Sequence, residues 1–149
     1  MGNITQRLAP HTTIGLDTSI FIYHLEAHPR YLPVTRTVLQ GVQSGRYAAV
    51  TSVITLMELT VHPWRRQQPV VARAYEALLV HFPHLHLADV TRAVSRRAAQ
   101  LRAQHNLRPA DALQVATALH HRATAWITND AQLRRLAGLM DVVILDEWV

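Results

Sequence analysis

Three acidic residues stand where a folded chain can present a carboxylate to a ligand. Asp17 directly follows a short apolar run, and Asp130 comes just after the apolar run 125–128. Asp111 falls in the first turn of a helical segment that Pro109 opens. Ligands of open parallel sheets bind outside the carboxyl ends of the strands. The sequence therefore predicts Asp17 and Asp130 at that edge, with Asp111 within reach from a helix start.

Glu58 is placed differently, inside a predicted helix over 53–61 and between apolar neighbours. A charge at a largely buried position is costly unless it is paired or bound to a metal ion. Two interpretations of Glu58 remain open. It forms an ion pair with an arginine such as Arg65 or Arg108, or it belongs to the same acidic site as the other three carboxylates.

Four carboxylates that converge without a cation repel one another, and their pKa values rise. A hard divalent cation removes this repulsion, and Mg²⁺ and Mn²⁺ favour oxygen ligands. Such a site can activate water and stabilise charge on a phosphate undergoing in-line displacement. All 15 basic residues of the chain are arginine, whose planar guanidinium suits phosphate. This combination points to the hydrolysis of phosphodiester bonds.

Each acid taken singly also has a purely structural interpretation. Asp17 can cap the helix that follows it, because aspartate is a favoured N-cap residue. Asp111 and Asp130 can complement helix dipoles from the first turns of their helices. Position alone therefore does not join the four acids into one site.

Alternating short apolar runs and helical segments indicate the elements that must position these acids. Strands are predicted at 14–16, 48–50, 85–87, 125–128 and 142–145. A helix is predicted to follow Thr18 or Ser19 and to run to about Leu25, and further helices are predicted at 34–44, 53–61, 70–82, 90–104, 110–122 and 130–136. Strands that alternate with helices imply an α/β fold with a parallel sheet covered on both faces. Residues 14–149 are interpreted as one domain, and residues 1–13 as an N-terminal tail.

Polar residues and prolines predict the helix boundaries. The predicted N-caps are Thr18 or Ser19, Thr51 or Ser52, Asp89, and Asn129. The helix that begins at Val53 is predicted to end at His62-Pro63, because proline cannot donate a backbone hydrogen bond.

The composition excludes several classes of protein. The 149 residues suit one domain, and 49% of them are apolar, which is enough for a core. The absence of cysteine excludes disulfides and thiolate zinc sites, and the absence of lysine excludes Schiff-base and P-loop chemistry. The ten histidines show no zinc motif such as H-E-x-x-H and are interpreted as surface residues. No apolar run approaches the roughly 20 residues of a membrane span, so we expect a cytoplasmic protein with no membrane partner.

Short motifs follow one another in order along the chain. They are Leu16-Asp17-Thr18-Ser19, Thr51-Ser52 followed by Glu58, Ala110-Asp111-Ala112-Leu113 with Ala116 behind it, Ile127-Thr128-Asn129-Asp130, and Val142-Val143-Ile144-Leu145-Asp146. Together they resemble the successive motifs of PIN (PilT N-terminus) domains, from near Ile14 to the C-terminus. Each motif is short, and it is their common register that makes the resemblance specific.

The resemblance implies a three-layer α/β/α sandwich with a central parallel sheet and a Mg²⁺- or Mn²⁺-dependent ribonuclease site. Asp17, Glu58 and Asp111 match the core acids of the family, and Asp130 matches the fourth acid. These four residues are therefore the expected catalytic residues and metal ligands.

Three further residues are expected to support the site. Ser19 and Thr128 match small polar residues that family members place beside the metal, although many members have asparagine at the position of Ser19. Arg108 lies three residues before Asp111 and is expected to contact the phosphate of the substrate.

The expected function is that of an endoribonuclease that cuts tRNA or another structured or single-stranded RNA. Bacterial members of the family are often VapC-type toxins held inactive by a small antitoxin. The expected partners are therefore RNA, such an antitoxin, and a second copy of the chain in a homodimer. One alternative is a catalytically silent PIN-fold module that binds RNA or protein. Another is a DNA-directed flap-type nuclease, which the short chain disfavours.

Overall fold

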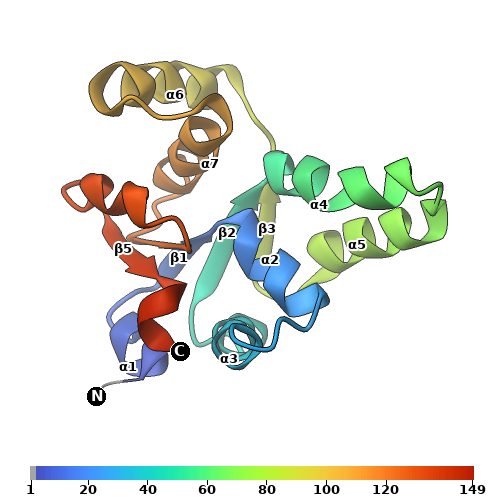
Figure 1. Cartoon of the computed structure of the whole chain (residues 1–149). Helices are drawn as coiled ribbons and strands as arrows, with labels where there is room; N and C mark the ends of the chain where they lie inside the picture. The colour runs from blue at the N-terminus through green and yellow to red at the C-terminus, as the bar shows by residue number, and fades with distance from the viewer. Residues whose placement is uncertain (1–2) are drawn as a thin grey trace.

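Short parallel strands form the centre of the computed structural model, which describes residues 3–149 (Figure 1). The strands are β1 (Thr13–Leu16), β2 (Ala48–Ser52), β3 (Leu85–Ala88), β4 (Ala125–Thr128) and β5 (Asp141–Ile144). Their order across the sheet is β3-β2-β1-β4-β5, and every neighbouring pair is parallel. The predicted parallel sheet is confirmed.

Helices cover both faces of the sheet and enclose two apolar cores. The helices, with η for a 3₁₀ helix, are α1 (Ile4–Leu8), α2 (Thr18–Leu25), α3 (Leu32–Gln43), α4 (Val53–Arg65), α5 (Pro69–His81), α6 (Arg92–His105), α7 (Pro109–His120), η1 (Ala131–Leu136) and η2 (Leu145–Trp148). Strand side chains alternate between the faces. Ile127 packs in the core under α1 to α5, whereas its neighbour Trp126 packs under α6, α7 and η1. This arrangement is the predicted three-layer α/β/α sandwich.

The path of the chain across the sheet changes direction beside β1. The crossovers through α2–α3 and α4–α5 lead to β2 and β3 on one side, and α6–α7 lead back to β4 on the other. Open α/β sheets bind ligands at such a switch point. Asp17 follows β1 there, and its N–H donates to the carbonyl oxygen of Ile127 in β4 at 3.0 Å. The ends of β1 and β4 therefore meet at the predicted site.

Gly15 in β1 allows α7 to pack closely on the sheet. A Cβ atom at this position would lie 2.7 Å from Cε3 of Trp126 and 2.8 Å from Cβ of Ala118 in α7. Any larger residue would push these groups away. Since α7 carries Asp111 in its first turn, this contact fixes how near Asp111 comes to β1.

The segment before β1 contains α1, a helix that hydrophobic periodicity does not predict. A capping box between Asn3 and Gln6 opens it, and Ile4 and Leu8 are buried in the core. A helix of five residues offers only one apolar pair at helical spacing, which is too little signal for a prediction. The expected tail thus packs onto the sandwich.

The end of α4 differs from the prediction. This helix continues through Pro63 to Arg65, so the predicted end at His62-Pro63 is wrong. Pro63 lies in the last turn, where the missing N–H removes one hydrogen bond and no further turn depends on it. Its ring is buried, which compensates for that loss.

Several N-caps also differ from the prediction. The observed caps are Asp17 for α2, Ser52 for α4, Thr91 for α6 and Asp130 for η1. Ser52 confirms a predicted cap, and Asp17 confirms the alternative structural interpretation of that residue as a helix cap. Thr18 or Ser19, Asp89 and Asn129 were each the wrong member of a run of polar residues, because sequence does not reveal which residue has the extended backbone of a cap. Within residues 3–149, no helix combines the length and apolarity needed to cross a membrane.

Candidate active site

Asp17 directly follows β1 and caps α2. Its Oδ1 accepts a hydrogen bond from the N–H of Thr18 at 2.7 Å, and its Oδ2 accepts one from Oγ1 of Thr128 at 2.6 Å. None of the ion pairs formed by residues 3–149 includes Asp17. Burial, together with the smaller effects of the Asp111 and Glu58 carboxylates, raises the pKa of Asp17 to about 6 despite the two hydrogen bonds.

Glu58 lies on α4 and reaches towards the start of α2. Its Oε1 accepts a hydrogen bond from Oγ1 of Thr18 at 2.8 Å. Thr18 therefore holds two acids, Asp17 through its N–H and Glu58 through its hydroxyl. The side chain of Glu58 is half-buried, and among residues 3–149 it forms no ion pair with Arg65 or Arg108. The interpretation of Glu58 as one half of an arginine pair is wrong.

Asp111 and Asp130 lie on either side of the Arg108 guanidinium. Nε of Arg108 is 3.6 Å from Oδ2 of Asp111, and Nη2 is 3.8 Å from Oδ2 of Asp130. Burial raises the pKa of Asp111, the nearby carboxylates of Asp130 and Glu58 add to the rise, and Arg108 opposes it. Arg108 itself is 77% exposed, so it screens these acids weakly and stays free to meet an anion from solvent.

The four acids lie close enough to affect one another's pKa values. Asp111 and Glu58 raise the pKa of Asp17, and Asp130 and Glu58 raise the pKa of Asp111. We refer to Asp17, Glu58, Asp111 and Asp130 as the acidic cluster. It lies at the switch point, as the strand ends predicted.

Thr128 and Ser19, the two small polar residues expected beside the acids, differ in their hydrogen bonding. Thr128 bridges the cluster, because its Oγ1 donates to Asp17 and accepts from the N–H of Asp130 at 3.1 Å. Oγ of Ser19 is buried and has no hydrogen-bond partner among residues 3–149. A buried hydroxyl of this kind is normally satisfied by water or a ligand. Ser19 thus leaves an unused polar group two residues after Asp17.

The donor chemistry of the cluster suits a hard cation, but the cluster is not a closed cage. No three acidic or histidine side chains of residues 3–149 are grouped closely enough to hold a metal ion as they stand. Mg²⁺ does not need such a group, since it commonly binds through one or two carboxylates and keeps several waters. The oxygen-only cluster and the unsatisfied Ser19 hydroxyl fit a hydrated Mg²⁺ or Mn²⁺ ion. They do not fit a fully enclosed site.

Sequence reasoning missed two polar residues that lie buried beneath the cluster. Gln114 in α7 is 3% exposed, and Thr55 in α4 is fully buried. The only signal in the sequence is an amide among the apolar residues of the 110–122 helix. That pattern does not show what the amide contacts.

Comparisons with known proteins agree with this fold. The family model of the PIN domain matches residues 14–139. A toxin–antitoxin complex from Klebsiella pneumoniae is similar at 24% identity with a TM-score of 0.64, over 89% of this chain and 97% of that chain. A DNA-bound VapBC from Salmonella typhimurium is similar at 19% identity with a TM-score of 0.68, over 89% of this chain and 98% of that chain. VapBC2 from Rickettsia felis, bound to a promoter DNA fragment, is similar at 17% identity with a TM-score of 0.68, over 87% of this chain and 96% of that chain.

A comparison with curated proteins gives no match. The solved structures share the fold at low sequence identity, and the family model spans most of the chain, including all four acids of the cluster. The chain belongs to the PIN domain family.

Proposed function

We propose that this protein is an endoribonuclease that depends on Mg²⁺ or Mn²⁺. The observation that carries the proposal is the Asp17 carboxylate, which is buried beside other acids and has no ion-pair partner among the described residues 3–149. Such an arrangement is costly for a structural role and favourable for binding a divalent ion. Nucleases are typical of the PIN family, which agrees with this chemistry.

The acids of the cluster and Arg108 have different proposed roles. A divalent cation, when bound, supplies a Lewis acid that lowers the pKa of water and neutralises charge on a phosphate. Asp17, Glu58, Asp111 and Asp130 would hold it. Arg108 is exposed beside Asp111 and Asp130, so it can bind a phosphate of the RNA backbone. RNA is the proposed substrate, and Arg108 contributes to binding it more than to the chemical step.

We also propose a small antitoxin as a partner, because the similar solved structures include toxin–antitoxin complexes. A groove of about 330 Å³ between α2, α4 and α5 has Glu58 at its edge and apolar residues such as Leu25 and Val71 along its wall. A partner segment that filled this groove would lie against Glu58 and obstruct the cluster. A homodimer stays a prediction, which light scattering on the purified protein would test.

The experiment that tests the proposed function is a cleavage assay on a pool of tRNA and single-stranded RNA. Purified protein is incubated with Mn²⁺ or Mg²⁺, with EDTA, and as the Asp17→Asn variant. We expect cleavage that requires the metal and is lost in the variant. If the folded protein, free of any inhibitor, cuts nothing in the pool but retards RNA in a gel, the non-catalytic binding module is the better interpretation.

A further inference from the structure

A buried network of amide and hydroxyl groups lies directly beneath the acidic cluster, with Gln114 at its centre. Nε2 of Gln114 donates to Oγ1 of Thr18 at 3.1 Å and to Oγ1 of Thr55 at 2.8 Å. Its Oε1 accepts from Oγ of Ser52 at 2.7 Å. One amide thereby joins the starts of α2 and α4 to α7, which are the helices that carry or follow Asp17, Glu58 and Asp111.

The direction of each hydrogen bond in this network follows from the chemistry of the groups. The amide nitrogen of Gln114 can only donate, and it has two hydrogens, one for each threonine. The backbone N–H of Ser52 lies 3.4 Å from Oε1, which fixes the oxygen on that side because two donors would not face each other. Thr18 and Thr55 must therefore accept from Gln114.

A hydroxyl group that accepts from Gln114 has one hydrogen left to give. Thr55 gives its hydrogen to Thr51, at 2.6 Å, and Thr51 in turn donates to the carbonyl oxygen of Leu16 at 2.9 Å. Thr18 gives its hydrogen to Oε1 of Glu58 at 2.8 Å. Oγ1 of Thr18 also lies 3.2 Å from Oγ1 of Thr55, but Glu58 is the nearer acceptor. With Gln114 donating to Thr18, the hydroxyl hydrogen of Thr18 is thus free to point at Glu58.

We infer that Gln114 is a positioning residue for the acidic cluster, acting through Thr18 on Glu58, an inference that rests on the proposed nuclease function. Glu58 is a long side chain with several rotatable bonds, and Thr18 is its one hydrogen-bond donor among residues 3–149. Because Thr18 also binds Asp17 through its N–H, the orientation of Thr18 sets the spacing of the two carboxylates. Supporting contacts of this kind typically change metal affinity by 10–100-fold.

The location of Gln114 on α7 extends this role to a third acid. Asp111 and Gln114 are three residues apart on one helix, so they lie on the same side of it. The Gln114 side chain is 3% exposed, and its amide meets the hydroxyls of Ser52, Thr18 and Thr55. The amide thereby ties the start of α7 to the helices that bear the other acids.

The test begins with metal-free protein in solution. Side-chain couplings measured by NMR report whether Glu58 occupies one rotamer. We expect one rotamer in the wild type and rotamer averaging in Gln114→Met, which keeps the length of the side chain and removes its hydrogen bonds. Thr117→Val is the matched control, because Thr117 is equally buried on α7 and bonds only to the Leu113 carbonyl oxygen. An unchanged Glu58 rotamer in Gln114→Met would overturn the inference.

The second measurement is the affinity for Mn²⁺, followed by the loss of the free-ion signal in electron paramagnetic resonance. We expect Gln114→Met to weaken Mn²⁺ binding by about 10-fold and Thr117→Val to leave it unchanged. Combining Gln114→Met with Thr18→Val should weaken binding no more than Thr18→Val alone, since Gln114 acts on Glu58 through Thr18. Additive losses would contradict action through Thr18.

These measurements separate failure of this inference from failure of the proposed function. If the wild-type protein neither binds Mn²⁺ nor cuts RNA, the proposed function is wrong. The rotamer of Glu58 still decides whether Gln114 positions this side chain. If Gln114→Met does not fold, Thr18→Val tests the same path from its other end. Glu58 should then lose its single rotamer, and retention of that rotamer would overturn the inference.

Discussion

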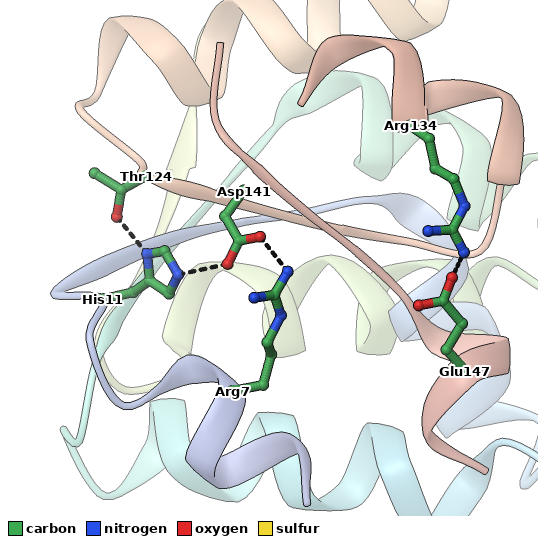
Figure 2. Close-up of polar contacts among 6 residues, drawn as sticks. All are labelled: Arg7, His11, Thr124, Arg134, Asp141 and Glu147. Atoms are coloured by element: carbon green, nitrogen blue, oxygen red, sulfur yellow. Dashed lines mark hydrogen bonds and ion pairs between the residues drawn. The ribbon is translucent and has the colours of Figure 1, made fainter. Parts of the chain in front are cut away.

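Asp17 and Asp141 lie at opposite ends of the parallel strands, which we call the carboxyl edge and the amino edge of the sheet. The two aspartates differ in whether basic side chains contact them. Asp141 begins β5 at the amino edge, where both of its oxygens meet basic side chains: Arg7 contacts Oδ1, and Nε2 of His11 lies 2.9 Å from Oδ2 (Figure 2). Asp17 follows β1 at the carboxyl edge, where its partners are an N–H and a hydroxyl without charge.

The difference separates a carboxylate that stabilises the fold from one that is available to a ligand. At the amino edge, Arg7 and His11 belong to the segment around α1, so the charge of Asp141 fastens that segment to the sheet. A similar pair, Arg134 with Glu147, joins η1 to η2 (Figure 2). At the carboxyl edge, Asp17 and Glu58 form no ion pair among residues 3–149, and Asp111 and Asp130 share only the exposed Arg108. The structure therefore pairs Asp141 with basic side chains where it fastens α1 to the sheet, and leaves Asp17 without such a partner at the proposed site.

The largest expected difference between the two aspartates is in catalysis. Asp17→Asn should lower the rate of RNA cleavage at least about 100-fold, because it removes a charged oxygen donor from the cluster. Asp141→Asn should leave the rate within about twofold at temperatures where the protein is folded, because Asp141 lies at the other edge of the sheet. Initial rates at saturating Mn²⁺ measure both. Equal losses of cleavage rate in the two variants would contradict the assignment of Asp17 to the active site and of Asp141 to the fold.

The same substitution should also change stability in opposite directions at the two sites. The pKa of Asp17 is about 6 in the folded chain against 3.8 ordinarily, so the folded state is penalised when this group is ionised, above pH 6. Asp17→Asn should therefore stabilise the metal-free protein at pH 7.5, by on the order of 2–3 kcal/mol. The gain should shrink as the pH falls through 6 towards 4. Urea unfolding in EDTA at several pH values measures it, and a gain that does not depend on pH would count against the assigned cause.

Asp141→Asn should instead destabilise the protein, by about 1 kcal/mol at neutral pH, because Arg7 and His11 lose their common anion. The effect is smaller than at Asp17, since Arg7 is 41% exposed and solvent screens part of the pair. Urea unfolding of this variant at pH 7.5 provides the comparison. Stabilisation at both positions would mean that Asp141 is not a structural anchor.

The smallest expected effect concerns Arg108, which touches the acidic cluster from solvent. Arg108→Ala should raise KM for RNA by about 3- to 10-fold and change kcat little, because an exposed arginine contributes mainly to binding the phosphate backbone. Steady-state kinetics at two salt concentrations measure this, and the variant should show a weaker dependence on salt. A fall in kcat with unchanged KM would assign Arg108 to the chemical step instead.

The sequence predicts the carboxyl edge better than the amino edge, for a physical reason. Asp17 and Asp130 each follow a strand and Asp111 begins a helix that Pro109 opens, so local patterns locate these three. The motifs of the PIN family add Glu58 to them. The contact of His11 with Asp141 joins residues 130 positions apart, and no periodicity reports such a pair. Side-chain networks such as that of Gln114 escape prediction similarly, because they depend on which helices the sheet order brings together.

Binding of Mn²⁺ to metal-free protein tests most directly the claim that Asp17 is left unneutralised for a cation. Titrations followed by electron paramagnetic resonance would compare the wild type with Asp17→Asn and Asp141→Asn, all shown to be folded. The account predicts that the wild type and Asp141→Asn bind Mn²⁺ with the same affinity and that Asp17→Asn binds it at least about 10-fold more weakly. Equal binding by all three proteins, or no binding by the wild type, would contradict it.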